Sequence, residues 1–190
     1  MNNNQNKNLS KFIKISLLGA MSVVLMYFDF PIPFLPFPWL KIDLSDVPSL
    51  MGALAYGPLT GIVIELLKNL LILLVKGTQT GLIGEIANFI VGISLVVPAA
   101  YLYNKNRNKK NLIIGMILGL ISMEVIGIIT NIYFLLPAFN MPMSGTEAIK
   151  YITIGLIPFN GIKAIMVNGI SYYLFKRLAK LIFNIDSKLH

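Results

Sequence analysis

Long apolar stretches separated by short charged segments are the feature that most constrains this chain. From Leu112 to Leu136, for example, Glu124 is the only ionisable residue. A helix needs roughly 20 mostly apolar residues to cross the hydrocarbon core of a membrane. Hydrophobic residues make up 56% of the 190 residues and charged residues only 13%, about half the charged share of a soluble protein. We therefore expect an all-α integral membrane protein with little chain left for a soluble catalytic domain.

The composition excludes several kinds of chemistry. The chain has no cysteine and one histidine, His190, its last residue. Disulfides, thiolate metal sites and histidine-based metal or acid–base sites are therefore not expected. The net charge of +8 lies between the apolar stretches, where membrane topology explains it better than nucleic acid does. We expect neither a nucleic-acid partner nor a metal.

Six spans are expected within one transmembrane domain covering 1–190. Their approximate bounds are 12–28, 47–57, 59–75, 82–103, 112–135 and 154–175. The number depends on whether Gly57-Pro58 is a real turn or only a kink, which would leave five spans. Cytoplasmic segments carry an excess of Lys and Arg, and six spans place nearly all the basic residues outside the spans on one side. That side holds Lys7, Lys11, Lys14, Lys105, Arg107, Lys109, Lys110, Lys176, Arg177, Lys180 and Lys188, and the other holds Lys41, Lys76 and Lys150. We expect a multi-pass protein of the cell membrane with both termini in the cytoplasm.

The segment between the first two spans is unusual. Four prolines between Pro31 and Pro38 forbid a regular helix, yet the segment is too apolar to lie comfortably in water. We expect a long, partly buried outer loop that folds back over the protein or enters the interface. Asp46 is expected to cap the next helix, with Pro48 in its first turn.

Polar residues at membrane depth are the best indication of a site. An ionisable group there costs about 2.5–3.5 kcal/mol on insertion scales, so each needs a partner or a function. Three-residue spacing puts Glu85 with Asn88, and Asn160 with Lys163, on shared helix faces. The six-span topology brings these four, with Asn131 and the loop residue Lys41, towards the outer side. The pattern predicts an outward-opening polar cavity beside an aromatic loop, suited to a small aromatic solute with several hydrogen-bonding edges.

Glu65 and Lys68, three apart in the third span, are expected to support helix packing rather than bind a ligand. Gly115 and Gly119 have the spacing that allows two helices to approach closely, and they serve either packing inside the chain or contact with a partner helix.

No phosphate-binding loop or hydrolase motif is present, so uphill transport would need energy from another chain or an ion gradient. A small enzyme acting on lipid head groups would usually need clustered acidic ligands, and the chain shows only scattered glutamates. A lone ion-coupled carrier would often show internal repeats with broken helices, which are not found.

Together these features resemble a known family. The six short spans, the basic N-terminus, the long apolar loop and the Asn160-x-x-Lys163 pattern are similar to the substrate-binding (S) component of an energy-coupling factor (ECF) vitamin transporter. The run from Phe37 to Pro48, followed by Gly52-Ala53 and Tyr56-Gly57-Pro58, most resembles the riboflavin-specific subfamily. The resemblance implies a non-enzymatic, high-affinity riboflavin-binding protein that needs no cofactor. It also implies a transmembrane coupling subunit and two cytoplasmic ATPases as partners.

The resemblance also implies residue roles. Riboflavin, as the bound substrate, is expected to contact Leu40, Lys41, Glu85, Asn88, Asn131, Asn160 and Lys163. The flavin dione edge offers carbonyl acceptors and an imide donor, which asparagine and lysine can match. The coupling partner is expected to dock on Ser16, Gly19 and Ala20. Pantothenate, folate and thiamine remain alternative vitamins, although the two lysines do not favour a cation such as thiamine.

Overall fold

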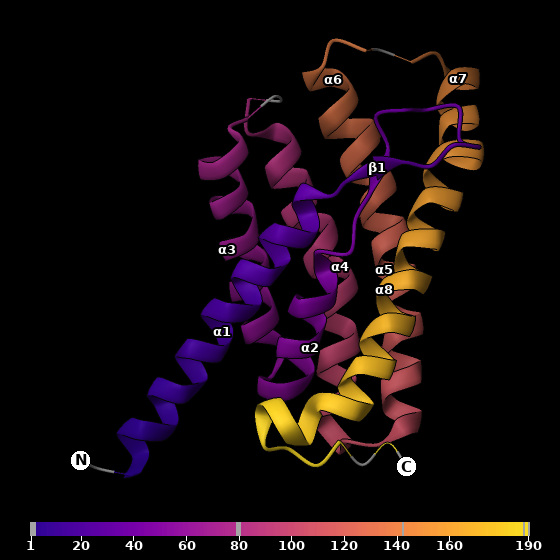
Figure 1. The fold of residues 1–190 in the computed structure, drawn as a ribbon. Coiled ribbons are helices and arrows are strands. Elements are labelled where there is room, and N and C mark those ends of the chain that lie inside the picture. The colour runs from indigo at the N-terminus through magenta and orange to yellow at the C-terminus, as the bar shows by residue number, and fades with distance from the viewer. Residues whose placement is uncertain (1–2, 79–80, 142, 188, 190) are drawn as a thin grey trace.

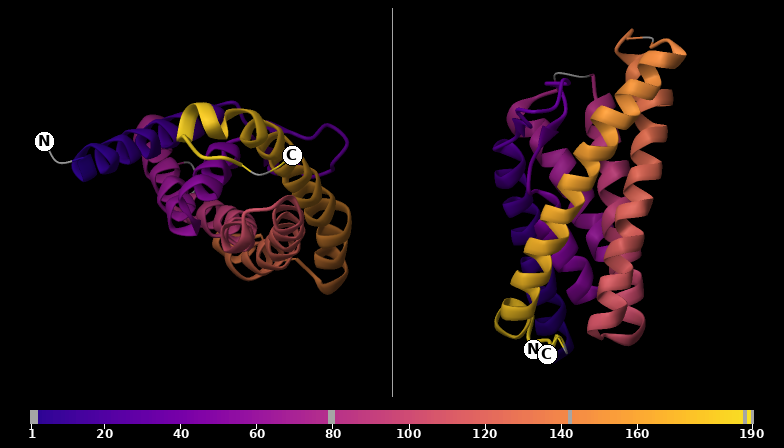
Figure 2. Two further views of the ribbon diagram at one scale, coloured as in Figure 1. Left: turned by 90° about the horizontal axis from the view of Figure 1, so that it is seen from below. Right: turned by 90° about the vertical axis from the view of Figure 1, so that its right-hand side faces the viewer.

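The computed structural model describes residues 3–78, 81–141, 143–187 and 189. Lys188 and His190, considered above for their charge and chemistry, lie outside the described residues. The chain forms an elongated helical bundle, and its N- and C-terminal ends lie at the same end of it (Figures 1 and 2). That arrangement requires an even number of passes, as the six expected spans do.

The elements follow one another with short connections. In chain order they are α1 (Asn3–Tyr27), β1 (Phe30–Pro31), β2 (Lys41–Ile42), α2 (Asp46–Tyr56), α3 (Pro58–Lys76), α4 (Ile83–Asn106), α5 (Lys109–Thr130), the π-helical η1 (Asn131–Leu135), α6 (Leu136–Ala138), α7 (Gly145–Lys150), the π-helical η2 (Tyr151–Leu156), α8 (Ile157–Leu178) and the π-helical η3 (Ala179–Phe183). The short strands β1 and β2 pair antiparallel, with Phe30 opposite Ile42.

The second pass is made jointly by a loop and a short helix. Five helical segments of the described chain are long and apolar enough to cross a membrane, and α2 is not among them. Its 11 residues span only about 16 Å, roughly half the hydrocarbon core. The first loop, residues 28–45, covers the remaining depth by descending into the bundle, where Ile32, Leu40 and Ile42 are buried. The all-α membrane fold with a partly buried first loop is thus confirmed.

The turn between α2 and α3 is real. Gly57 has a φ of +101°, a conformation that favours glycine because it has no Cβ. Pro58 follows at the first position of α3, where its missing N–H costs nothing. Two separate helices therefore form where a single kinked helix was the alternative.

Two sequence-based expectations were wrong in detail. The last helical segment begins at Gly145, whereas the sixth span was expected to begin at about residue 154. Ser144 and Glu147 form a reciprocal capping box that satisfies free N–H groups at the helix start. Asp46 does not cap α2 either: it is the first helical residue, and Ser45 precedes it without a side-chain cap. The carboxylate of Asp46 binds two lysines instead.

Glycines allow α4 and α5 to pack closely along their length. A Cβ on Gly115 would lie 2.8 Å from the carbonyl oxygen of Ala99, and one on Gly119 would clash with that of Leu95. Both contacts involve the α4 backbone, which cannot move without separating the helices. The small-residue spacing therefore serves packing inside the chain.

Gly119→Ala should lower the thermal unfolding midpoint of the protein in detergent. The added methyl group must push α4 away, at a cost of about 1–3 kcal/mol. Gly169→Ala is the matched control, because a Cβ there meets nothing within 4 Å and alanine favours helix. Equal midpoints for the two variants would contradict this account of α4–α5 packing.

Candidate ligand site

Two adjoining hollows lie between the first loop and the bundle. The inner one has a volume of about 180 Å³ and lies between the loop, α4, α5, η1 and α8. Its lining residues are Trp39, Leu40, Lys41, Gly84, Ala87, Asn88, Val91, Met123, Asn131, Leu135, Phe159, Asn160 and Lys163. Six of the seven residues expected to contact a ligand are therefore brought to one cavity. Their role in binding stays a prediction.

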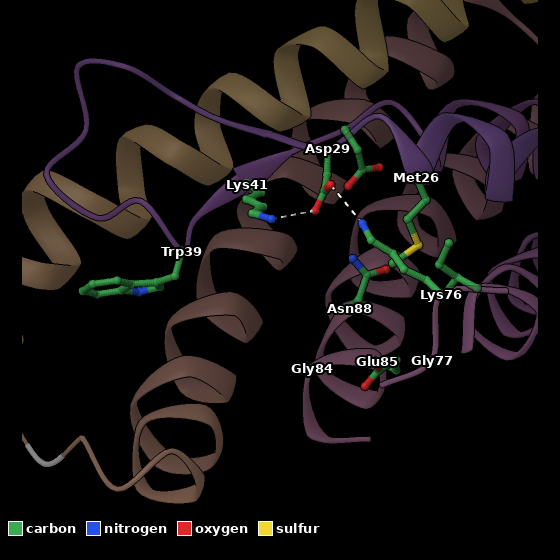
Figure 3. A pocket seen from close by; sticks show the side chains of 11 residues that line it. Met26, Asp29, Trp39, Lys41, Lys76, Gly77, Gly84, Glu85 and Asn88 are labelled. Carbon is green, nitrogen blue, oxygen red and sulfur yellow. Dashed lines mark hydrogen bonds and ion pairs between the residues drawn. The ribbon is translucent and has the colours of Figure 1, made fainter. Parts of the chain in front are cut away.

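The seventh residue, Glu85, lines the neighbouring hollow of about 260 Å³ (Figure 3). The two hollows share Trp39, Lys41, Gly84 and Asn88 in their linings. Together they reach the lower part of the range typical of small-molecule sites, roughly 300–1,000 Å³. The site therefore combines the inner hollow with a larger neighbouring one, the vestibule, lined in part by the loop.

Asn88 lines both hollows and has unused hydrogen-bonding capacity. Its side-chain carbonyl oxygen is buried and has no hydrogen-bond partner among the described residues. A buried acceptor without a partner costs roughly 1–3 kcal/mol. A ligand donor at this position would remove that cost, which makes Asn88 the strongest single candidate for a ligand contact.

The other two asparagines are held by neighbours. Asn131 begins η1; its amide N–H donates to the carbonyl of Gly127 at 2.9 Å, and its side-chain oxygen accepts from the Tyr151 hydroxyl at 2.9 Å. Asn160 on α8 donates to the carboxylate of Glu124 at 3.4 Å. Gly127 also lies under the Asn160 amide, where any Cβ would clash. The two amides are thereby oriented while keeping further capacity, since each carries two donors and two lone pairs.

Lys163 lies in a buried network of charges. Its ammonium nitrogen is 3.4 Å from a carboxylate oxygen of Asp43 in the loop and 3.1 Å from one of Asp46 on α2. Asp46 also binds Lys68 at 2.6 Å, and Lys68 binds Glu65 at 2.6 Å. The structural interpretation of Glu65 and Lys68 agrees with this geometry.

Sequence reasoning missed the roles of Asp43 and Asp46. Both lie in or next to the apolar loop and were not linked to the intramembrane lysines. The available signal was an imbalance: two lysines deep within the expected spans, Lys68 and Lys163, each need a counter-charge in the membrane. Two acidic residues just before a short apolar helix were available to supply it.

The vestibule has its own ion pairs. Asp29 accepts from Lys41 at 3.5 Å and from Lys76 at 3.2 Å, as the dashed lines in Figure 3 show. Glu85 accepts a hydrogen bond from Thr78 at 3.3 Å. Lys41 and Lys76 are partly exposed, so their pairing with Asp29 can exchange with solvent or a ligand at little cost.

The expected docking residues on α1 do not all face the same way. Ser16 and Ala20 are exposed, whereas Gly19 is buried because its Cα packs against Leu67 of α3. Gly19 therefore supports packing inside the bundle, and the docking role of the three residues stays a prediction. The N-terminal part of α1 also projects away from the other helices (Figure 1; Figure 2, left).

The fold and this cavity define a class: a small multi-pass membrane protein that encloses a solute at one end of a helical bundle, under a loop. The chain belongs to the family described as "ECF transporter, substrate-specific component", whose model matches residues 10–175. Members of this family are components of transporters, so the alternative of a membrane enzyme is rejected.

Named relatives support the assignment over nearly the whole chain. The riboflavin transporter RibU of Staphylococcus aureus (strain TCH60) is 40% identical, covering 96% of this chain and 95% of the relative. The riboflavin transporter FmnP of Bacillus subtilis (strain 168) is 36% identical, covering 90% and 92%. A solved structure described as "Structure and mechanism of the S component of a bacterial ECF transporter" superposes with a TM-score of 0.79 at 39% identity, covering 94% of this chain and 98% of that one.

Asp46→Asn should destabilise the ligand-free protein strongly. It removes the counter-charge shared by Lys68 and Lys163, and breaking a buried ion pair typically costs about 3–5 kcal/mol. Asp29→Asn is the matched control, because its pairs with Lys41 and Lys76 are partly exposed and worth about 1 kcal/mol or less. Thermal unfolding in detergent measures both. Similar midpoints would mean that the buried network does not support the fold.

Proposed function

We propose that this chain is a high-affinity riboflavin-binding component of an ECF vitamin transporter. The observation that carries the proposal is the cavity itself, in which polar side chains from the loop, α4, η1 and α8 converge. The printed names of the relatives, both riboflavin transporters, favour riboflavin over pantothenate, folate or thiamine.

The chemistry of the lining suits a flavin. Asn131 and Asn160 each present an amide that can both donate and accept, which matches the alternating acceptors and donor of the dione edge. Leu40 and Phe159 supply apolar contact for the faces of the rings. Lys41 and Glu85, at the vestibule, suit the hydroxyl groups of the ribityl chain. Lys163 reaches the cavity with its charge balanced by Asp43 and Asp46. It therefore suits a neutral carbonyl group of the ligand better than a negatively charged group.

Orientation and partners belong to the same proposal. The end that carries both termini also carries most of the basic residues, including Lys105, Lys109 and Arg177, which favours a cytoplasmic location for that end. The cavity then opens outwards, where the vitamin is captured. A transmembrane coupling subunit and two cytoplasmic ATPases would supply energy that this chain has no motif to provide. No cofactor is needed for binding.

Protein purified in detergent should carry flavin, visible as the two absorption bands of oxidised flavin at near-stoichiometric occupancy. If ligand is lost during purification, added riboflavin should lose its fluorescence on binding, as flavin emission is quenched by stacking against aromatic rings. A colourless protein that also leaves riboflavin fluorescence unchanged would sink the flavin assignment. The other vitamins would then be tested in turn.

Asn88→Ala should weaken riboflavin binding by about tenfold, the effect of one lost hydrogen bond of roughly 1.4 kcal/mol. Asn168→Ala is the matched control. Asn168 is another membrane-embedded asparagine whose side-chain oxygen has no partner among the described residues. It lines a separate hollow between α5 and α8, where its amide N–H donates to the Met116 carbonyl at 3.3 Å. Titration of riboflavin fluorescence measures both affinities. Equal affinities would remove Asn88 from the site.

Ala20→Trp should block assembly with the coupling subunit while leaving riboflavin affinity unchanged. Ala20 and Ser16 are exposed one helical turn apart on α1, where a large side chain would hold a partner helix away. Val24→Trp, further along the exposed surface of α1, tests how far the face extends. Co-purification of the complex measures assembly. Normal assembly of Ala20→Trp would place the docking face elsewhere.

A further inference from the structure

The tip of the first loop packs against a surface of η2 that includes Tyr151 and Gly155, called its seat. The ring of Phe37 meets that of Tyr151 edge-on, with centroids 4.8 Å apart. Gly155, one helical turn further on, makes room for Phe37: a Cβ there would lie 2.6 Å from its ring. Leu40 is buried in the same cluster as Tyr151 and Leu156. The side chains of the loop therefore pack closely against those of η2.

A hydrogen-bonded relay crosses this seat. The indole N–H of Trp39 donates to the hydroxyl oxygen of Tyr151 at 3.4 Å, and the same hydroxyl donates to the side-chain oxygen of Asn131 at 2.9 Å. Trp39 and Asn131 both line the inner cavity, whereas Tyr151 is absent from its lining and only 1% exposed. One buried hydroxyl thus joins the loop to a ligand-facing amide without reaching the cavity.

We propose that Tyr151 is a positioning residue that couples closure of the first loop to the presentation of Asn131 to the bound vitamin. When the loop packs against η2, the Tyr151 hydroxyl accepts a hydrogen bond from the indole N–H of Trp39. The same hydroxyl donates a hydrogen bond to the side-chain oxygen of Asn131. The amide N–H of Asn131 is held by Gly127, so the second N–H and the remaining lone pair face the ligand together. This inference rests on the proposed function, because it assigns Asn131 to the vitamin.

The location of the relay in π-helical segments agrees with this role. Asn131 is the first residue of η1 and Tyr151 the first residue of η2. A π-helical turn re-aims side chains relative to a regular helix and is frequent at functional sites. Both partners of the hydrogen bond therefore lie where a regular α-helix changes to a π-helical segment.

The test compares riboflavin dissociation rates for Tyr151→Phe, Trp39→Phe and the double variant of the full-length protein in detergent. Tyr151→Phe removes the hydroxyl and keeps the ring, whereas Trp39→Phe removes the indole N–H and leaves a smaller aromatic ring. Tyr151→Phe should speed dissociation by about tenfold, and Trp39→Phe by several-fold, as expected for one or two lost hydrogen bonds. The double variant should be no faster than Tyr151→Phe, because the relay is already broken. Tyr133→Phe, an exposed tyrosine of η1, is the control and should match the unmodified protein.

Trp39 supplies a second readout that needs no ligand, since it is the chain's only tryptophan. In ligand-free protein, Tyr151→Phe should shift Trp39 emission to longer wavelength as the loop leaves its seat, and Tyr133→Phe should not. If Tyr151 had a purely structural role, the fold increases in dissociation rate of the two single variants would multiply in the double variant. That result would overturn the inference. An unchanged dissociation rate in Tyr151→Phe would overturn it as well. If the unmodified protein binds no flavin, the proposed function fails separately, and an unshifted Trp39 emission would then reject the coupling too.

Discussion

Five charged side chains buried in the bundle are the interaction on which the rest of the structure depends. Asp43, Asp46, Glu65, Lys68 and Lys163 come from the first loop, α2, α3 and α8. Charges removed from water are tolerated only when they are paired with good geometry. Lys163 of α8 pairs with Asp43 of the loop and Asp46 at the start of α2, and Lys68 of α3 pairs with Asp46 as well as with Glu65. These pairs hold the loop inside the bundle. The short length of α2 follows from this descent of the loop.

The descent of the loop creates the site. Once residues 40–43 are drawn inwards, Leu40 and Lys41 become a wall of the cavity that α4, η1 and α8 complete. The ion network keeps Lys163 at the cavity with its charge balanced, so the asparagines carry much of the remaining recognition. The aromatic tip of the loop then rests on Tyr151. The stability of the fold, the shape of the cavity and the position of its cover therefore share one set of contacts.

Several parts of this arrangement could be predicted from the sequence, because they depend on local pattern. Apolar length identified the spans, and the three-residue spacing of Asn160 and Lys163 placed them on one face of a helix. The topology then brought most of the candidate residues to one side, and the structure places six of the seven around one cavity. The early start of the last helical segment was missed, since the capping box at Ser144 and Glu147 lies in a segment that is polar enough to suggest a loop.

The sequence by itself determined that the chain is a six-helix membrane protein with a polar site at one end, because membrane solvation imposes length, hydropathy and charge bias residue by residue. Only the tertiary structure decided which charges meet, how deeply the first loop is buried and where Tyr151 lies. Asp43 and Lys163 are paired at 3.4 Å although they are 120 residues apart, and Gly19 is buried although Ser16 and Ala20 are exposed. Such contacts depend on how helices rotate and pack against one another, and that geometry is absent from the periodicity of any single segment.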